Sequence, residues 1–374
     1  MKKLSLVVFL FIIFSIIFSF YNNHLKGAWP AILPVRQPET AVPTGAVKPS
    51  QNTTGLPLKI PNGFTLSVFS ENLGSPRDLI EDPNGIILVS LIKEGKVVAL
   101  PDGKTILQNL NKPHGLAFKG DKLYVAETHQ VTSYDYNKNT LRATNPKKII
   151  DLPDGGNHFS RSIIFKGDLL LISVGSSCNV CKEKDQRRAA IIGVKEDGTS
   201  FTYATGLRNS VFMAIHPETE DLWATEMGRD LLGDDIPPDE INIVKEGRYY
   251  GWPYCYGKNS KDSAFDDSDN ANKTCAASEP SIINLKAHSA PLGLAFYNND
   301  LLVAYHGSWN RTVPTGYKIV RIKKLDSSPV VEDFITGWLE GNEAYGRPVD
   351  ILVSKLGTIF ISDDKKGVVY SLKP

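Results

Sequence analysis

Two short apolar strands joined by a polar turn recur six times along the chain, and this repetition restricts the fold more than any single residue does. Repeats of strand-length units at intervals of roughly 40 to 80 residues are typical of β-propellers, in which each unit forms one blade. The six copies begin at Arg77, His114, Arg161, Val211, Leu292 and Val349. We therefore predict an all-β fold, a six-bladed β-propeller with four-stranded antiparallel blades.

The two ends of the repeated region suggest how the ring closes. The strand-like sequence FTLSVFS begins at Phe64, upstream of the first copy, and VVYSL stands next to the C-terminus. We expect these two strands to pair, so that the N-terminal strand completes the last blade and leaves no free sheet edge. The propeller domain then spans residues 57–374.

The first 56 residues differ in kind from the body. Two lysines precede an apolar run from Leu4 to Phe20, a pattern that predicts a signal peptide or signal anchor over residues 1–22. Residues 23–56 are rich in Pro, Thr, Asn and Gly without periodicity, and we expect them to form a flexible tether. The protein is thus predicted to be exported, as a periplasmic or extracellular protein, either cleaved or held at the membrane by this segment.

The overall charge excludes one class of partner. Lysine and arginine number 42 against 41 acidic residues, and the formal net charge is +1. Because a protein that binds nucleic acid usually carries a basic excess, we expect no nucleic-acid partner. Membrane contact is expected only through the N-terminal segment.

Four cysteines fall into two local sets, Cys178 with Cys181 and Cys255 with Cys275. Disulfides persist in the oxidising compartments to which exported proteins go, so pairing within each set is the simplest expectation. Zinc binding and redox catalysis stay open as alternatives. A c-type haem is excluded because Lys182, and not histidine, follows the C-x-x-C.

Polar residues stand just before the first strand of each repeat, where a propeller gathers side chains around one end of its central channel. These positions hold Arg77, His114, His158 with Arg161, Arg208 with Asn209, His288 and Arg347. A ring of cations and imidazoles favours an anionic ligand, since guanidinium binds carboxylate or phosphate in a bidentate manner.

Several motifs appear in the order of one known family. GGNHFSR ends at Arg161, and a long stretch from Gly206 to Pro253 follows it. With these motifs the chain resembles the glucose/sorbosone dehydrogenase family, and SVGSSCNVC, GWPYCYG and HGSWNR place it nearest to the sorbosone dehydrogenase-like branch. The resemblance covers about Gly63 to Lys373. It implies a propeller that holds pyrroloquinoline quinone (PQQ) and Ca²⁺ over the channel mouth and oxidises sugars or related alcohols and aldehydes.

The resemblance also implies roles for individual residues. His158 matches the catalytic base, which accepts the proton of the substrate hydroxyl. Arg208 and Asn209 match the pair that binds the quinone, and Arg208 would stabilise negative charge on the reduced cofactor. Gly228 and Arg229 match the positions whose backbone carbonyls hold Ca²⁺, although Arg229 replaces the usual proline.

Other positions match the family only in part. Glu240 and Tyr250 match a second, structural calcium site, for which an ordinary loop carboxylate is the alternative. Arg347 matches one arginine that binds the cofactor carboxylates, but the second such position is Val349. A lysine of the fifth blade is absent as well, and His306, Trp309 and Arg311 in YHGSWNR are the candidates to replace it. Trp309 could stack on the quinone, although an aromatic residue is more often part of the core.

The insert between Cys255 and Cys275 carries Asp262, Asp266, Asp267 and Asp269. A calcium loop and a lid are both conceivable, but the spacing fails the EF-hand pattern and a solvated acidic loop is favoured. No glycine-rich fingerprint joins a strand to a helix, which argues against a nicotinamide cofactor.

These observations predict a dehydrogenase for a sugar, a sorbosone-like aldehyde or a polyol. Its electron acceptor is unidentified and would be a cytochrome or a quinone. A carbohydrate- or protein-binding propeller without catalysis is the main alternative, because propellers host many unrelated functions. A metal-dependent lactonase is less favoured, since it needs carboxylates and amides on one ion and the predicted ring consists mainly of His and Arg.

Overall fold

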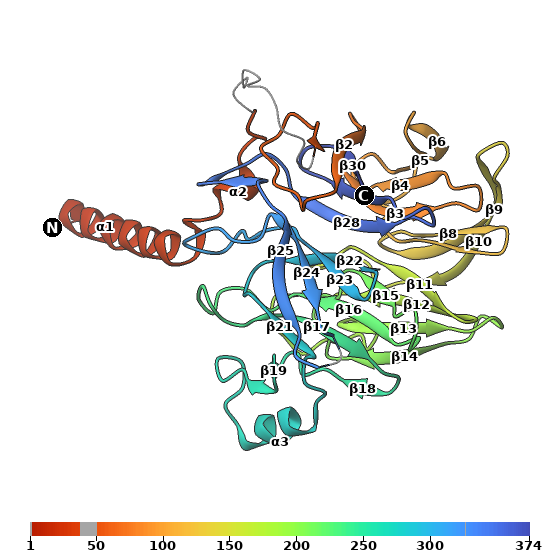
Figure 1. Ribbon diagram of the computed structural model, residues 1–374. Coiled ribbons are helices and arrows are strands. Elements are labelled where there is room, and N and C mark those ends of the chain that lie inside the picture. Colours follow the sequence, from red (N-terminus) through yellow and green to blue (C-terminus); the bar gives the residue numbers. More distant parts are fainter. Residues whose placement is uncertain (1, 38–50, 326) are drawn as a thin grey trace.

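A computed structural model describes residues 2–37, 51–325 and 327–374, without the side chains of residues 2–8. The six expected blades are present, each built on four antiparallel strands, and Figure 1 shows their sheets side by side in one propeller. The strands of the first three blades are β3 (Pro76–Glu81), β4 (Ile87–Leu91), β5 (Lys96–Ala99) and β6 (Lys104–Leu107); β7 (Leu116–Lys119), β8 (Lys122–Ala126), β9 (Gln130–Asn137) and β10 (Arg142–Asp151); and β11 (Ile163–Lys166), β12 (Leu169–Val174), β13 (Ala190–Val194) and β14 (Ser200–Thr205).

The other three blades complete the ring. They are β15 (Met213–Ile215), β16 (Leu222–Glu226), β17 (Asp239–Val244) and β21 (Ile283–Leu285); β22 (Pro291–Tyr297), β23 (Asp300–Tyr305), β24 (Lys318–Lys323) and β25 (Val330–Ile335); and β28 (Pro348–Val353), β29 (Ile359–Asp363) and β30 (Val368–Lys373) with β2 (Thr65–Ser70). The antiparallel pairing of β2 with β30 confirms that the N-terminal strand closes the last blade.

The first strand of each blade lies innermost and faces the central channel, as predicted from the repeats. The second strand is covered on both faces by neighbouring blades, and this explains its nearly continuous run of apolar residues. In β4 and β29, for example, every residue is buried. The core therefore consists of apolar layers between adjacent blades, such as the one that contains Trp338, Tyr370 and Ile319.

Several short strands and one helix are attached to the blades. A two-residue strand, β1 (Gln51–Asn52), extends the last blade, and β18 (Arg248–Tyr249) pairs with β14. The long insert of the fourth blade also holds the ribbon β19 (Cys255–Tyr256) and β20 (Ser260–Lys261) and the helix α3 (Asp269–Ala277). A second ribbon, β26 (Leu339–Glu340) with β27 (Glu343–Ala344), lies between the fifth and sixth blades.

Both expected disulfides form, Cys178 with Cys181 and Cys255 with Cys275. The only cluster of three metal-type ligands among the described residues consists of Cys178, Cys181 and Glu183. Because its two cysteines are joined to each other, this cluster does not favour the zinc alternative.

The N-terminal region departs from the expected flexible tether. Helix α1 (Lys2–Phe20) continues into a π-helical turn, η1 (Tyr21–Leu25), and a short helix, α2 (Trp29–Ile32). The segment that follows α1 rests on the body, because the amide of Gly27 donates to the carbonyl oxygen of Arg311 at 2.5 Å. Arg36 forms ion pairs with Glu340 and Glu343 at 3.1 and 3.2 Å. The remainder of the predicted tether, residues 38–50, lies outside the described residues.

Within the part of the chain that the structure describes, no helix reaches the length and hydropathy needed to cross a bilayer.

Candidate functional site

Two sets of loops meet at the same end of the propeller, which we call the mouth. One set joins the outermost strand of a blade to the innermost strand of the next blade, and the other joins the second strand to the third. Their ranges are 71–75, 108–115, 152–162, 206–212, 286–290 and 336–347 in the first set, and 92–95, 127–129, 175–189, 227–238, 306–317 and 364–367 in the second. Every sequence position predicted to gather around the channel lies in these loops or next to them.

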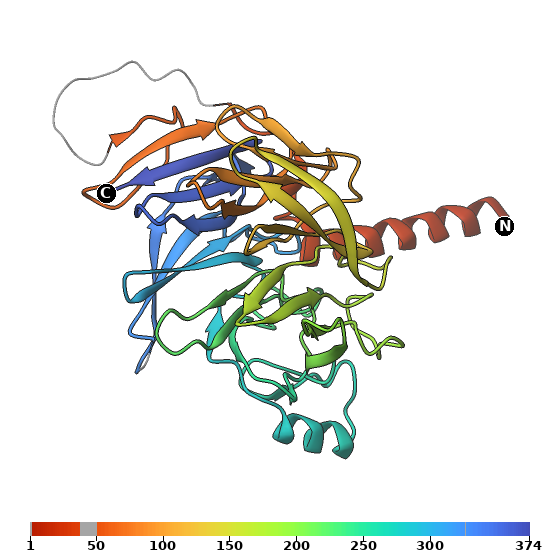
Figure 2. The ribbon, with the colours of Figure 1, turned by 90° about the vertical axis from the view of Figure 1, so that its right-hand side faces the viewer.

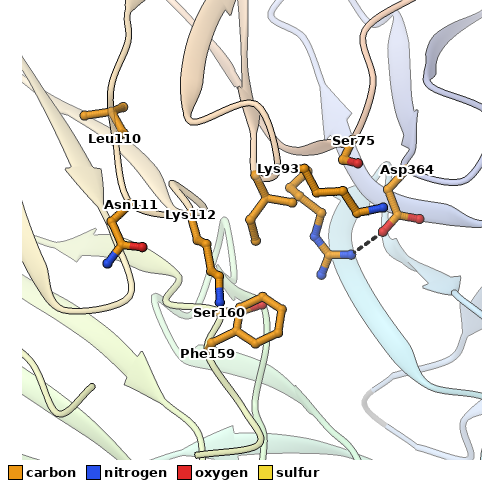
Figure 3. Close-up of a pocket in the computed structure, with 10 residues that line it drawn as sticks. Ser75, Lys93, Leu110, Asn111, Lys112, Phe159, Ser160 and Asp364 are labelled. Carbon is orange, nitrogen blue, oxygen red and sulfur yellow. Dashed lines mark hydrogen bonds and ion pairs between the residues drawn. The ribbon is translucent and has the colours of Figure 1, made fainter. Parts of the chain in front are cut away.

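A cavity of about 630 Å³ opens at the mouth between the first, second, third and sixth blades. Figure 3 shows Lys112 beside the ring of Phe159 and Asp364 across the cavity from them. The ammonium nitrogen of Lys112 lies 4.7 Å from the centre of that ring. Arg77 and Ser160 also line the cavity, so a polar ligand would meet cations on two sides.

Asp364 is the centre of a largely buried charge cluster at the wall of this cavity, with 19% of its side-chain surface exposed. Its carboxylate lies 2.7 Å from Nη1 of Arg77 and 2.8 Å from Nε2 of His306. Arg347 lies behind them and donates to the backbone oxygens of His306 and Gly307 at 3.0 and 2.6 Å. Burial alone would raise the pKa of Asp364, but His306, Arg77 and Arg347 hold that pKa well below its ordinary value. Asp364 is therefore ionised; it contacts Arg77 directly, and the charge of Arg347 lies near enough to stabilise it.

His158 has the tautomer that a base requires. Its Nδ1 lies 3.0 Å from the carbonyl oxygen of Ser176 and 2.9 Å from the hydroxyl of the same residue. Because a carbonyl oxygen only accepts hydrogen bonds, Nδ1 carries the hydrogen and Nε2 is left as the acceptor of the neutral ring. Burial, and then the nearby guanidinium of Arg208, lower the pKa of His158 to about 3. The imidazole is thus unprotonated at neutral pH.

Close packing fixes the position of His158. A Cβ atom on Gly175 would lie 2.6 Å from Cβ of His158, so only glycine allows this approach. Arg161 is fully buried and donates to the backbone oxygens of Pro153, His158 and Ser160 at 2.7 to 2.9 Å. Arg161 therefore holds the loop that presents His158 and is not itself a ligand for a molecule in the cavity.

Arg208 donates only to groups of the protein. Its Nε and Nη2 reach the carbonyl and side-chain oxygens of Asn179 at 2.9 Å, and Nη2 also reaches Asp230 at 2.9 Å. Its Nη1 reaches the carbonyl oxygens of Gly228 at 2.9 Å and Met227 at 3.3 Å. A direct contact between Arg208 and a quinone would require one of these acceptors to be exchanged. In this structure Arg208 instead supplies positive charge beside His158.

Asn209 lies between the two predicted catalytic residues. Its side-chain oxygen would be 2.7 Å from a Cβ on Gly175, which places it next to His158. The backbone N–H of Asn209 donates to the carboxyl group of Glu226 at 2.9 Å. Burial raises the pKa of Glu226 to about 8. Asn209 is thus held by its backbone while its side chain faces the same small space as His158.

One of the two predicted carbonyl ligands for calcium, that of Gly228, is engaged in another contact. The carbonyl of Gly228 accepts from Arg208, so Ca²⁺ bound there would stand beside a guanidinium that repels it. The side chain of Arg229 forms an ion pair with Asp262, at 3.0 Å between Nε and Oδ2, without hydrogen-bond alignment. Asp262 is buried by this pair and is not part of the solvated acidic loop that was expected, whereas Asp267 and Asp269 are exposed.

The side chains of Glu240 and Tyr250, the second predicted calcium pair, are also engaged in hydrogen bonds within the protein. The carboxylate of Glu240 accepts from the amide of Gly257 at 2.5 Å and from Asn242 at 3.0 Å. The phenol of Tyr250 donates to the carbonyl oxygen of Ile243 at 2.8 Å. These contacts direct the two side chains to different partners, and the structural calcium site stays a prediction.

The candidates in the fifth blade lie outside the cavity. Arg311 is buried and donates to the carbonyl oxygens of Val313, at 3.0 Å, and Asp234. It therefore ties two mouth loops together. Trp309 lies in the mouth loop 306–317 with 44% of its surface exposed. His306, in contrast, belongs to the Asp364 cluster, where burial and then Arg347 lower its pKa to about 4.

Three residues of this site escaped the sequence analysis. Ser176 orients His158, Asn179 orients Arg208, and Asp364 balances the two arginines. Both Ser176 and Asn179 belong to the motif SVGSSCNVC, Ser176 two residues before Cys178 and Asn179 inside the loop closed by Cys178 and Cys181, so the motif itself was the available signal.

The charges of the site fit an anionic cofactor. PQQ is an orthoquinone with three carboxylates, and carboxylates pair well with guanidinium groups. Among the described residues, Nε of Arg77 and Nη1 of Arg188 are buried nitrogens without a hydrogen-bond partner. Burial is the main cause of the lowered pKa of His158, and the guanidinium groups of Arg208, Arg161 and Arg188 lower it further.

The comparisons with known proteins agree with this geometry. A family model described as TrAA12-like matches residues 58–374. The chain is 32% identical to an uncharacterized protein of Borreliella burgdorferi over 84% of this chain and 90% of that protein. It is 24% identical to a pyrroloquinoline quinone-dependent pyranose dehydrogenase of Coprinopsis cinerea over 84% of this chain, but spans only 54% of that enzyme.

A solved structure shares the fold. The holo form of the PQQ domain of pyranose dehydrogenase from Coprinopsis cinerea superposes with a TM-score of 0.75 at 21% identity. The match covers 87% of this chain and all of that domain (100%). The chain spans about half the length of the whole fungal enzyme and corresponds in fold to its PQQ domain.

Proposed function

The chain belongs to the TrAA12-like family of PQQ-dependent soluble sugar dehydrogenase-like proteins, and on that premise we propose that it is an exported quinoprotein that oxidises a sugar, a sorbosone-like aldehyde or a polyol. The observation that carries the proposal is the neutral imidazole of His158, whose Nδ1 contacts Ser176 and leaves Nε2 as the acceptor. The next two residues in the chain, Phe159 and Ser160, line a cavity that also contains Arg77 and Lys112. PQQ would lie in that cavity, and an external acceptor, a cytochrome or a quinone, would reoxidise it.

The residues of the cavity would hold the cofactor by its carboxylates. Arg77 lines the cavity and pairs with Asp364, and Arg347 adds a second positive charge near that carboxylate, which favours an anion. Lys112 and Lys93 also line the cavity, and their charges add to its attraction for an anion. The quinone, when bound, supplies the acceptor for a hydride equivalent from the substrate carbon.

His158 would move the proton. Its Nε2 accepts the hydrogen of the substrate hydroxyl, while Nδ1 keeps its hydrogen bond to Ser176 and prevents the ring from turning. Arg208, Arg161 and Arg188 lower the pKa of the imidazole, and the carboxylates of a bound anion would offset part of that effect. An anionic cofactor would therefore make His158 more basic in the cofactor-bound protein than in the cofactor-free protein.

Calcium enters the proposal only through the family resemblance. The carbonyl of Gly228 is within 2.9 Å of Arg208, so no step is assigned to a metal ion. Whether PQQ binds more tightly when Ca²⁺ is present is a measurable property of the purified protein, and it decides this part of the proposal.

The test is turnover by the full chain loaded with PQQ. We expect an aldose, a sorbosone-like aldehyde or a polyol to reduce an artificial dye acceptor, in a reaction that depends on PQQ and proceeds at a measurable kcat on the order of 1–10³ s⁻¹. Each substrate is assayed with and without added Ca²⁺. If no member of these three classes gives dye reduction above the PQQ-free control, the dehydrogenase proposal is wrong and a binding propeller becomes the better account.

A further inference from the structure

Large apolar side chains are exposed around the mouth on several separate loops. We call this set, Phe159, Leu231, Ile236, Trp309 and Val313, the apolar rim. The rim residues come from the third, fourth and fifth blades, and Val313 has 67% of its surface exposed. Single exposed apolar residues are common on soluble proteins, but several on neighbouring loops at one end indicate an interaction surface.

The N-terminal segment adds to the same end of the molecule. Gly27 donates to Arg311 and Arg36 donates to Ala344, and both acceptors lie in mouth loops. Lys365, in the mouth loop of the sixth blade, donates to the carbonyl oxygen of Leu33. Because these contacts hold the segment on the mouth, its exposed residues Trp29, Ile32 and Leu33 lie on that side as well.

Helix α1 leaves the body from this docked segment. Its side chains from Phe9 to Phe20 are all exposed, and all but two serines, Ser15 and Ser19, are apolar. Figures 1 and 2 show the helix projecting away from the propeller, without a blade packed on it. An apolar helix and an apolar rim thus both face solvent at the mouth end of the molecule.

We propose that the apolar rim rests on a lipid bilayer, so that the mouth of the propeller faces the membrane surface. The continuity of the rim with α1 argues for lipid as the occupant, because an exposed helix without charged residues beyond Lys3 needs an apolar environment. Trp29 and Trp309 are suited to the lipid headgroup region, where tryptophan is enriched.

Charged residues near the apolar rim indicate which lipids it would contact. Lys112 and Asp235 are both exposed at the mouth, so charges of both signs occur there. An electrostatic preference for anionic lipid is therefore not required, and the apolar side chains supply the contact. Uncharged phosphatidylcholine vesicles are sufficient for the test.

The tryptophans of the chain allow a direct measurement. Of the five, Trp223, Trp252 and Trp338 are buried, and only Trp29 and Trp309 are exposed. In the full chain carrying Trp29→Phe, Trp309 is the single exposed tryptophan. This variant is reconstituted into phosphatidylcholine vesicles whose acyl chains are brominated, because bromine quenches tryptophan fluorescence on contact.

The matched control carries Trp29→Phe, Trp309→Phe and Leu356→Trp. Leu356 is 93% exposed in the turn between β28 and β29, at the opposite end of the propeller from the mouth. We expect brominated lipid to quench Trp309 and to leave the tryptophan at position 356 unquenched, relative to unbrominated vesicles.

Equal quenching at the two positions would overturn the proposal, and so would quenching at neither. If Trp309 is shielded from an aqueous quencher and is also not quenched by brominated lipid, and the protein is dimeric, the rim is an interface between copies and the lipid assignment is wrong. The measurement needs no PQQ and no substrate, so its outcome is independent of the proposed dehydrogenase activity.

Discussion

His158→Asn lowers kcat by about 10²- to 10⁴-fold, the range expected when a general base is removed. The asparagine amide can still donate to Ser176, as Nδ1 does at 3.0 Å, so the loop keeps its contact while the proton acceptor is lost. The affinity for PQQ should change little, because the arginines that would bind it are untouched. The measurement is the rate of dye reduction at saturating sugar and PQQ, together with the PQQ dissociation constant of each variant.

His216→Asn is the matched control. His216 lies at the end of β15, in the turn at the opposite end of the propeller, and is expected to leave kcat unchanged. Should His158→Asn keep the kcat of the unaltered protein, the base must be another group and the assignment of His158 is wrong. A loss of PQQ binding that equals the loss of rate would instead make His158 a binding residue.

Asp364→Asn is expected to lower the free energy of unfolding by about 3–5 kcal/mol, the typical effect of removing one partner of a buried charge cluster. Asp364 contacts Arg77 at 2.7 Å and His306 at 2.8 Å, and without its charge the two arginines of the cluster repel each other in a buried place. Urea denaturation of the cofactor-free protein measures this effect.

The same substitution should strengthen the binding of anions. An added carboxylate can take the place that Asp364 leaves, so we expect PQQ to bind Asp364→Asn more tightly and to restore part of the lost stability. Asp168→Asn is the control, because the ion pair of Asp168 with Lys119 is exposed and such pairs contribute only about 0–1 kcal/mol. A stable Asp364→Asn protein with weaker PQQ binding would show that Asp364 is not the counter-charge of an anion site.

The repeats predicted the fold because each blade contains one copy of the same pattern of strands and turns. Six inner strands follow from local patterns, and the two disulfides follow from short separations between cysteines. The pairing of β2 with β30 follows from the closure of a ring, since one strand stands at each end of the repeated region. The docking of the N-terminal segment did not follow, since Gly27 uses a backbone amide that composition does not reveal. The same holds for Asp262, whose partner Arg229 belongs to a different loop.

The sequence predicted which positions form the site, but not the hydrogen bonds and ion pairs among them. His158 and Arg208 were found from motifs, yet the acceptors that occupy Arg208, Asn179 and Asp230, come from two other loops. Asp364 stands in the sequence ISDDKKG, which has the composition of an ordinary surface turn. Only closure of the ring brings it to Arg77, which lies 287 positions away in the chain.

The most direct test of the account is a titration of the full chain with PQQ, followed by the absorbance of the quinone and by the melting temperature, with and without Ca²⁺. The account predicts saturable binding and a melting temperature that rises with PQQ concentration, because a ligand of the folded state stabilises it. It also predicts that Arg77→Gln weakens this binding, since Arg77 lines the cavity. If PQQ neither saturates the protein nor raises its melting temperature at any Ca²⁺ concentration, the cavity at the mouth does not hold this cofactor and the central claim is contradicted.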